Sequence, residues 1–194
     1  MTDDDVYFDI PVQINNKFEK RISEVFRVFD HRAINMVNGE DIGSILRFLG
    51  CVPTEEQIQT IIKNTEFPSH PGDIHLSNFL PYIKDLLIRH EMKPSKPEAL
   101  LQAFKILDPK DKGFIEKEIF ESFIKDCGEA MSEETYKEMM KTAVDPIEKK
   151  VYYEPYIRKL MHEPEDSIYK LADAYIATTE GSRASMRRKT FLSK

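Results

Sequence analysis

Glycine and cysteine are both scarce in this sequence of 194 residues, and each shortage argues against a class of site. The 7 glycines form no phosphate-binding glycine loop, and the sequence offers no paired nucleophile and base, so we expect no enzyme. The 2 cysteines, Cys51 and Cys127, form no metal-type cluster. In a reducing compartment, we expect them to be free thiols.

Long apolar runs are also lacking. The most apolar segment, FLPYIKDLLI, is short and is interrupted by Lys84 and Asp85, so it does not suit a membrane span. The opening residues, MTDDDVYFDIP, lack the basic residues and the apolar run of a signal peptide. These features predict a soluble intracellular protein.

The charge is acidic overall and unevenly distributed. With 28 basic and 34 acidic residues the net charge is −6, which favours basic partners and argues against nucleic acid as the main ligand. From Gly181 onward every charged residue is basic. We expect this end to be disordered by itself and to contact an acidic surface through Arg183, Arg187, Arg188 and Lys189.

The chain contains an internal repeat. Phe26, Asp30 and Gly50 recur 78 positions later as Phe104, Asp108 and Gly128, and the apolar pattern of the following helices recurs with them. A repeat at fixed spacing indicates two similar structural units. The predicted segments are an acidic N-terminal segment, a first unit, a proline-containing linker, a second unit and a C-terminal extension, at residues 1–16, 17–92, 93–97, 98–162 and 163–194.

Apolar residues at helical spacing predict an all-α protein. The expected helices are 17–29, 40–49, 54–65, 76–91, 97–107, 116–126, 132–143 and 154–162. Thr54 with Gln57 predicts a capping box, and Ser132 predicts a hydroxyl cap at the start of its helix. In the extension, EDSIYKLADAYIA is expected to form an amphipathic helix with Ile168, Leu171 and Tyr175 on one face.

The segments FRVFD and IGSILRFLGCVPTEEQI resemble the first hand and following helix of calmodulin-like EF-hand proteins. The resemblance implies two calmodulin-like lobes, each a pair of EF-hands with four helices. A short β-type contact between the loops should join the hands through Val37 with Ile74 and Ile115 with Val151. EF-hand loops hold calcium with oxygen ligands at fixed positions and a bidentate glutamate at position twelve.

The first two loops depart from that ligand pattern. The first, Asp30–Asp41, places Arg32 and Ile34 at ligand positions, and Asn35 replaces the glycine of the turn. The cation would repel calcium by several kcal/mol, roughly 8 at close range and an effective dielectric near 20. The second loop, Glu66–Asn78, is one residue too long and poor in acids. Its two histidines are expected to be ordinary surface residues rather than metal ligands.

The last two loops are also degenerate. The third, Asp108–Ile119, is the closest of the four to the calcium-binding pattern, but it has Lys110 and Lys112 at ligand positions and Ile119 in place of the bidentate glutamate. The fourth, Val144–Pro155, fits in neither possible register. We therefore expect no metal site and no cofactor.

A more specific resemblance concerns the EF-hand subunits of the nexin–dynein regulatory complex of motile cilia. It is based on the first hand, the FLPYIKDLL helix, LLQAFKILDPKDKGFI and AVDPIEKKVYYEPYI. The resemblance implies an axonemal protein of cilia or flagella whose partners are other subunits of the complex, with a doublet microtubule as a further contact of the basic tail. It also implies a structural and regulatory role in ciliary motility.

A partner helix, of IQ type, is expected to lie in apolar grooves of the two lobes without calcium. Alignment to the family places in these grooves Phe29, Ile42, Leu46, Ile61, Ile62, Phe79 and Ile83 of the first lobe and Leu107, Phe120, Ile124, Met139, Met140, Leu160 and Met161 of the second. Two alternatives remain open from the sequence. One is a calcium sensor of ciliary motility, and the other is a cytosolic calmodulin-like adaptor.

Overall fold

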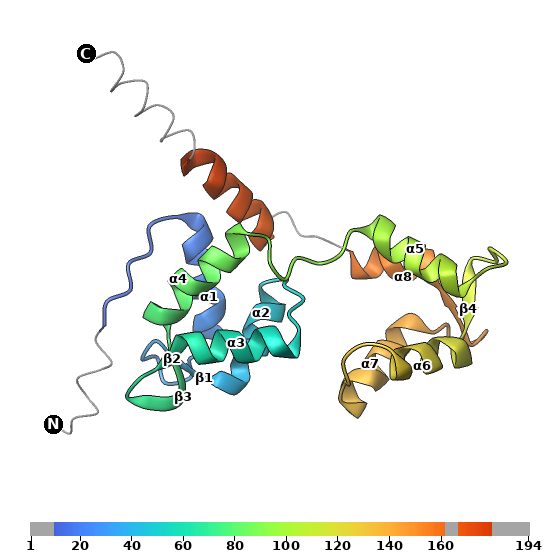
Figure 1. Cartoon of the computed structure of the whole chain (residues 1–194), viewed down its shortest axis with the longest axis horizontal. Helices are drawn as coiled ribbons and strands as arrows, with labels where there is room; N and C mark the ends of the chain where they lie inside the picture. The colour runs from blue at the N-terminus through green and yellow to red at the C-terminus, as the bar shows by residue number, and fades with distance from the viewer. Residues whose placement is uncertain (1–9, 162–166, 180–194) are drawn as a thin grey trace, which may run out of the picture. The chain divides into compact units, whose positions relative to one another are not determined.

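The computed structural model describes residues 10–161 and 167–179, which fold as two helical units (Figure 1). Residues 10–94 and 167–179 form the N-terminal unit, and residues 95–161 form the C-terminal unit. No helix in these ranges is long and apolar enough to span a membrane.

The N-terminal unit consists of two helix–loop–helix hands joined by a small sheet. Its helices are α1 (Lys17–Phe29), α2 (Ile42–Phe48, after a 3-10 turn at Gly39–Asp41), α3 (Glu55–Thr65) and α4 (Leu76–Ile88). Its strands are β1 (Met36–Asn38), β2 (Glu66–Phe67) and β3 (His70–His75), antiparallel in the order β1-β3-β2. Val37 lies opposite Ile74, as the loop residues predict.

The C-terminal unit repeats this arrangement. Its helices are α5 (Pro97–Leu107), α6 (Lys117–Asp126), α7 (Glu133–Ala143) and α8 (Tyr153–Leu160). Strands β4 (Phe114–Glu116) and β5 (Lys150–Tyr152) form an antiparallel pair in which Ile115 lies opposite Val151. The predicted contact between paired loops is therefore confirmed in both units.

Local signals in the sequence explain where several helices begin. The Thr54 hydroxyl accepts the backbone N–H of Gln57, and the Gln57 side chain accepts the backbone N–H of Thr54, which forms the expected capping box of α3. The Ser132 hydroxyl accepts the Thr135 N–H at the start of α7. Pro97 occupies the first turn of α5, where its missing N–H leaves no helical bond unmade.

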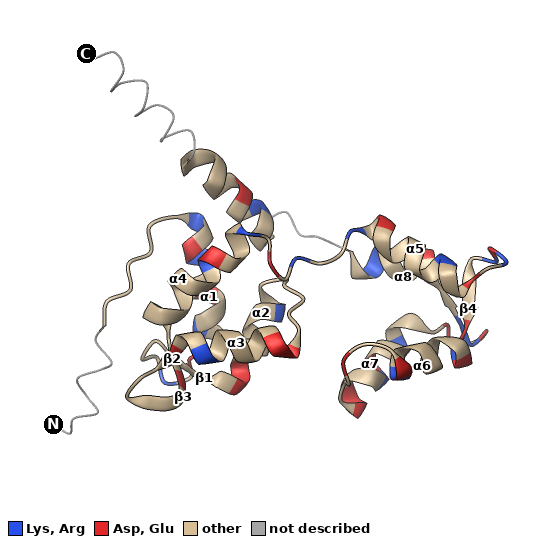
Figure 2. Ribbon diagram, in the orientation of Figure 1, with Lys and Arg blue, Asp and Glu red and all other residues tan. Residues whose placement is uncertain are grey.

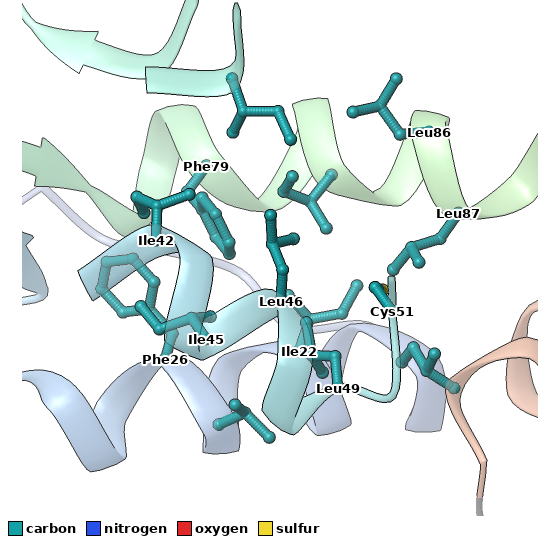
Figure 3. Packing of buried hydrophobic residues seen from close by; sticks show 14 of the residues in the cluster. Ile22, Phe26, Ile42, Ile45, Leu46, Leu49, Cys51, Phe79, Leu86 and Leu87 are labelled. Atoms are coloured by element: carbon teal, nitrogen blue, oxygen red, sulfur yellow. The ribbon is translucent and has the colours of Figure 1, made fainter. Parts of the chain in front are cut away.

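The two units differ in how completely they bury their apolar side chains. In the N-terminal unit Ile22, Phe26, Ile45 and Leu46 are fully buried, and Figure 3 shows them converging between α1, α2 and α4. The core of the C-terminal unit is smaller and is built around the stacked rings of Phe104 and Tyr153. The N-terminal unit is therefore the more tightly closed of the two.

The segment 168–179 is a helix that packs on the N-terminal unit. Ile168, Tyr169 and Ala172 are buried in the core of that unit, and Leu171 and Tyr175 pack partly against it. In Figure 1 this helix lies beside α4. The residues predicted as a separate extension therefore contribute to the N-terminal unit at least over 167–179.

Candidate functional site

In the first loop, the acidic residue that would begin a calcium site is engaged by the backbone. The Asp30 carboxylate accepts the Asn35 N–H at 2.7 Å and the Ile34 N–H at 3.3 Å. Asn35 has a φ of 58°, so it makes the turn expected of it without glycine. The Arg32 guanidinium forms an ion pair with Asp73 of β3 at 3.1 Å. At this ligand position the first loop therefore has a salt bridge and no oxygen ligand.

The third loop keeps its first acid for a similar structural purpose. The Asp108 carboxylate accepts the Gly113 N–H at 2.8 Å and the Tyr153 hydroxyl at 3.2 Å. Desolvation raises the pKa of Asp108, but the backbone N–H groups of Lys112 and Gly113 and the Tyr153 hydroxyl outweigh it, so the pKa falls below its usual value. Ile119, at the position of the missing glutamate, is half exposed.

The other two loops are likewise held by internal hydrogen bonds. The Asp145 carboxylate accepts the N–H groups of Ile147 and Glu148 at 2.9 and 2.8 Å. Glu66 accepts the Gly72 N–H at 2.6 Å. These carboxylates fix the turns of loops that carry too few acids for a cage.

His75 corrects the expectation that the second-loop histidines lie on the surface. It is fully buried, stacks obliquely near the Phe67 ring and caps α4 by accepting the Ser77 N–H at Nδ1. Burial lowers the pKa of His75, and the negative charge of Asp30 opposes this only in part. The surface position expected for His75 is wrong because a capping role for histidine has no clear signal in the sequence.

The donor sets of the four loops do not fit a calcium ion. Across residues 10–161 and 167–179, no three His, Cys, Asp or Glu side chains come together in a group that could hold a metal. Calcium needs six to eight oxygen ligands, several of them carboxylate. No step of the function is therefore assigned to the ion.

The predicted groove residues of the N-terminal unit come together as core. Ile42, Leu46, Ile61, Phe79 and Ile83 are buried, and Phe29 and Ile62 pack partly against the same cluster. In this conformation they form no open surface. A partner would reach them only if the hands separated.

The predicted groove residues of the C-terminal unit are less covered. Phe120 and Met140 are buried, Leu160 is 52% exposed, and four others pack partly against the core: Leu107, Ile124, Met139 and Met161. Several of these side chains therefore reach the surface. Their assignment to a partner groove stays a prediction.

One face of the C-terminal unit has an apolar groove that the sequence did not reveal. The groove has a volume of about 480 Å³. It is lined by Leu107, Glu118, Ile119, Ser122, Phe123, Asp126 and Cys127. Only Leu107 was among the predicted groove residues. Ile119 and Phe123, one helical turn apart on α6, were the available signal, because both are exposed apolar residues.

The N-terminal unit carries its own bound helix. The Tyr169 hydroxyl donates to the carbonyl of Glu91 at 3.1 Å, and His90 Nε2 lies 2.7 Å from the Asp173 carboxylate. The Tyr175 ring lies 5.8 Å from that of Phe18 in α1. Aromatic and polar contacts therefore fix the segment 168–179 at several points.

A mostly buried ion pair lies beside this helix. Lys84 of α4 donates to Glu19 of α1 at 2.6 Å, and its ammonium is 5.0 Å from the Tyr175 ring centre. Burial raises the pKa of Glu19, but hydrogen bonds from Lys84 and from the backbone of Asn15 contribute to a net lowering. The hydrogen bond to Glu19 raises the pKa of Lys84.

Elsewhere, basic and acidic side chains are interspersed along the helices of both units (Figure 2).

The predicted contacts of the basic tail fall outside the described residues. Arg183, Arg187, Arg188 and Lys189 all follow residue 179. Their contact with an acidic surface remains a prediction.

Curated relatives identify the family of the chain. Dynein regulatory complex protein 8 of Mus musculus is 34% identical over 145 residues, which cover 75% of this chain and 88% of the relative. The protein of the same name from Chlamydomonas reinhardtii is 32% identical over 162 residues, which cover 78% and 96%. The chain belongs to the dynein regulatory complex protein 8 family. It matches no family model.

Solved structures show the fold of this family member. The Physarum polycephalum myosin II regulatory domain matches with a TM-score of 0.60 and 25% identity, over 74% of this chain and 94% of that chain. Mlc1p bound to IQ2 of Myo2p, a class V myosin, matches with a TM-score of 0.57 and 20% identity, over 72% and 96%. The predicted fold of two calmodulin-like lobes is confirmed, and it is also the fold of myosin light chains.

Proposed function

We propose that this chain is a light-chain-like subunit of the nexin–dynein regulatory complex in the axoneme of motile cilia or flagella. It binds a helix, of IQ type, in a larger subunit of the complex and contributes to control of ciliary motility without catalysing a reaction. The observation that carries the proposal is the membership in the dynein regulatory complex protein 8 family together with a light-chain fold.

The proposed binding does not depend on calcium. Backbone and side-chain donors engage the first acid of the first and third loops, and Arg32 pairs with Asp73. The hands are joined by apolar β contacts at Val37 with Ile74 and at Ile115 with Val151, which need no metal. These contacts support a fold that is assembled before any ion binds.

The fold suits an IQ-type helix. A related fold is bound to IQ2 of Myo2p in the Mlc1p structure. An amphipathic helix binds in such a groove through apolar anchors at helical spacing, and methionine adapts to varied anchors because its thioether is flexible. Met139 and Met140 of α7 and Met161 after α8 belong to the C-terminal core or pack on it, which supports the proposal.

The test is a comparison of partners with and without calcium. Cells with motile cilia express the tagged chain, and partners from a ciliary extract are compared by quantitative mass spectrometry in chelator and in calcium, with the tag alone as control. We expect the same regulatory-complex subunits in both conditions. Partners that appear only in calcium would make the chain a sensor, and an absence of these subunits in both would contradict the proposal.

A further inference from the structure

The two units can be compared position by position, because the repeat is preserved in three dimensions. Strand Met36–Asn38 corresponds to Phe114–Glu116, and the helical segment 39–48 corresponds to α6 at Lys117–Asp126. The glycines that end these segments, Gly50 and Gly128, have φ values of 88° and 89°. A constant offset of 78 residues therefore gives equivalent positions along both first hands.

One equivalent pair differs in a way that changes the surface. In the N-terminal unit the Phe48 ring packs edge-on against Phe29, with centroids 5.6 Å apart. Ile45, one turn earlier on α2, and the following Leu49 are both buried. Phe48 thus shields part of the Phe29 ring at the end of α1, while 67% of its own surface stays exposed.

In the C-terminal unit the position of Phe48 is held by Asp126. A carboxylate does not cover apolar neighbours, and the equivalents of Ile45 and Leu49, which are Phe123 and Cys127, are exposed. The groove of about 480 Å³ lies at this place. The C-terminal unit therefore has an open space where the N-terminal unit has its own aromatic side chain.

The polar lining of the groove indicates the charge of an occupant. Its two charged residues, Glu118 and Asp126, are both acidic, and Ser122 donates to Asp126 at 2.9 Å. Apolar walls favour an apolar anchor, because burying it removes Leu107, Ile119 and Phe123 from water. Carboxylates at the edge favour lysine or arginine next to that anchor.

We infer that this groove receives an apolar anchor side chain from a basic amphipathic helix of the partner, in the place that Phe48 holds in the N-terminal unit. The inference rests on the proposed function and adds the surface, the unit and the chemistry of the anchor.

Fluorescence of a designed peptide provides the probe. The protein contains no tryptophan, so a single tryptophan in the peptide reports its own burial. The peptide is a short amphipathic helix with lysine on its polar face and leucine on its apolar face, with tryptophan at the centre. A matched peptide has glutamate in place of lysine. With the full chain in chelator, we expect a blue shift and saturable binding for the lysine peptide and much weaker binding for the glutamate peptide.

The decisive variant fills the groove with the side chain found in the other unit. We expect Asp126→Phe to weaken the lysine peptide by about tenfold or more, as loss of a central anchor pocket does. Circular dichroism and thermal unfolding should show a folded protein of equal or higher stability, because the new ring would contact Leu107 as Phe48 contacts Phe29. Asp126→Asn removes the charge without filling the space and should retain most of the tryptophan shift. Ile147→Asp changes an exposed apolar residue outside the groove and should leave binding unchanged.

The outcomes separate this inference from the proposed function. Equal binding by Asp126→Phe and the unaltered chain overturns the inference while leaving helix binding elsewhere intact, and no binding by the unaltered chain also overturns it. Partner recovery from ciliary extract, judged separately, decides the proposed function.

Two other occupants of the groove would also be detected. If light scattering shows a dimer that Asp126→Phe abolishes, the occupant is a second copy of the chain. Tighter binding by a chain ending at residue 179 would make the basic tail the occupant. Either result would overturn the partner assignment.

Discussion

At the scale of single residues, Lys84 links α1, α4 and the helix 168–179. Its ammonium bonds to the buried Glu19 and lies near the Tyr175 ring. We expect Lys84→Met to lower the stability of the N-terminal unit by about 2 kcal/mol, because the carboxylate loses its partner while remaining buried. Hydrogen–deuterium exchange of peptides from this unit, followed in increasing urea, measures the change.

The pH dependence of that loss follows from the lowered pKa of Glu19. A carboxyl with a lowered folded pKa contributes stability above its unfolded value of 4.5 and loses it as the pH falls through the folded value. The difference between Lys84→Met and the unaltered chain should therefore shrink on acidification. Lys20→Met removes an exposed pair with Glu24 and should change stability by less than about 1 kcal/mol. Equal losses in both variants would contradict the argument.

His75 makes the N-terminal unit sensitive to mild acid. Burial lowers the pKa of His75 in the folded protein. As the pH falls, the unfolded chain therefore protonates His75 before the folded protein does, near the ordinary histidine pKa of about 6.5. The stabilising contribution is complete above that value and declines as the pH falls below it. His75→Asn keeps an acceptor for the Ser77 N–H without titrating in this range. Between about pH 7.5 and pH 5.5, this variant should show a smaller fall in the urea midpoint of the unit than the unaltered chain.

The matched control for this prediction is His31→Asn, at an exposed position in the first loop. It should keep the pH dependence of the unaltered chain. If the urea midpoint changes equally with pH in the unaltered chain, His75→Asn and His31→Asn, His75 does not cause the sensitivity.

At the scale of elements, the helix 168–179 is a structural part of the N-terminal unit. Ile168 and Tyr169 are buried against it, and burial of such side chains contributes about 1.5–3 kcal/mol each. A chain ending at residue 166 should therefore lose at least about 3 kcal/mol of stability in this unit. It should also expose Cys51, which is buried and whose pKa burial raises to about 11.

Thiol labelling measures this exposure directly. In the unaltered chain, the exposed Cys127 should react quickly with a disulfide reagent and the buried Cys51 slowly. After truncation at 166 both should react quickly. A chain ending at 179 retains the described helix and serves as control. Slow labelling of Cys51 in the shorter chain would show that the helix does not protect it.

Local rules allowed the elements to be predicted from the sequence. Helical spacing, the Thr54 and Ser132 caps and the repeat located the helices and the paired loops, because these signals act over neighbouring residues. The side on which 168–179 packs could not be predicted. Its apolar face was visible at Ile168, Leu171 and Tyr175, but an amphipathic face does not name the surface that covers it.

The site was harder to predict than the fold for a related reason. Alignment to the family gave the apolar positions but not their exposure, so Ile42 and Phe79 were assigned to a groove although they are core in this conformation. The inferred anchor site differs from its N-terminal equivalent by Asp126 in place of an aromatic residue. The sequence alone does not show that this position faces the end of the preceding helix; the ring contact of Phe48 with Phe29 in the structure shows it.

At the scale of the whole molecule, the unequal cores predict two separate unfolding steps. The N-terminal unit buries a large cluster and holds the helix 168–179, whereas the C-terminal unit has a smaller core. In increasing urea, exchange of C-terminal peptides should therefore rise at a lower denaturant concentration than exchange of N-terminal peptides.

Partner binding should then act on one of these steps. A ligand that binds only the folded C-terminal unit stabilises that unit by mass action, by about 2.7 kcal/mol at a concentration a hundred times its dissociation constant. The lysine peptide should therefore raise the urea midpoint of the C-terminal unit and leave that of the N-terminal unit unchanged. Asp126→Phe should keep the two steps and lose the response to the peptide. A response of both units would mean that a partner helix also opens the N-terminal core, and then Ile42, Leu46 and Phe79 would regain the binding role that the alignment gave them.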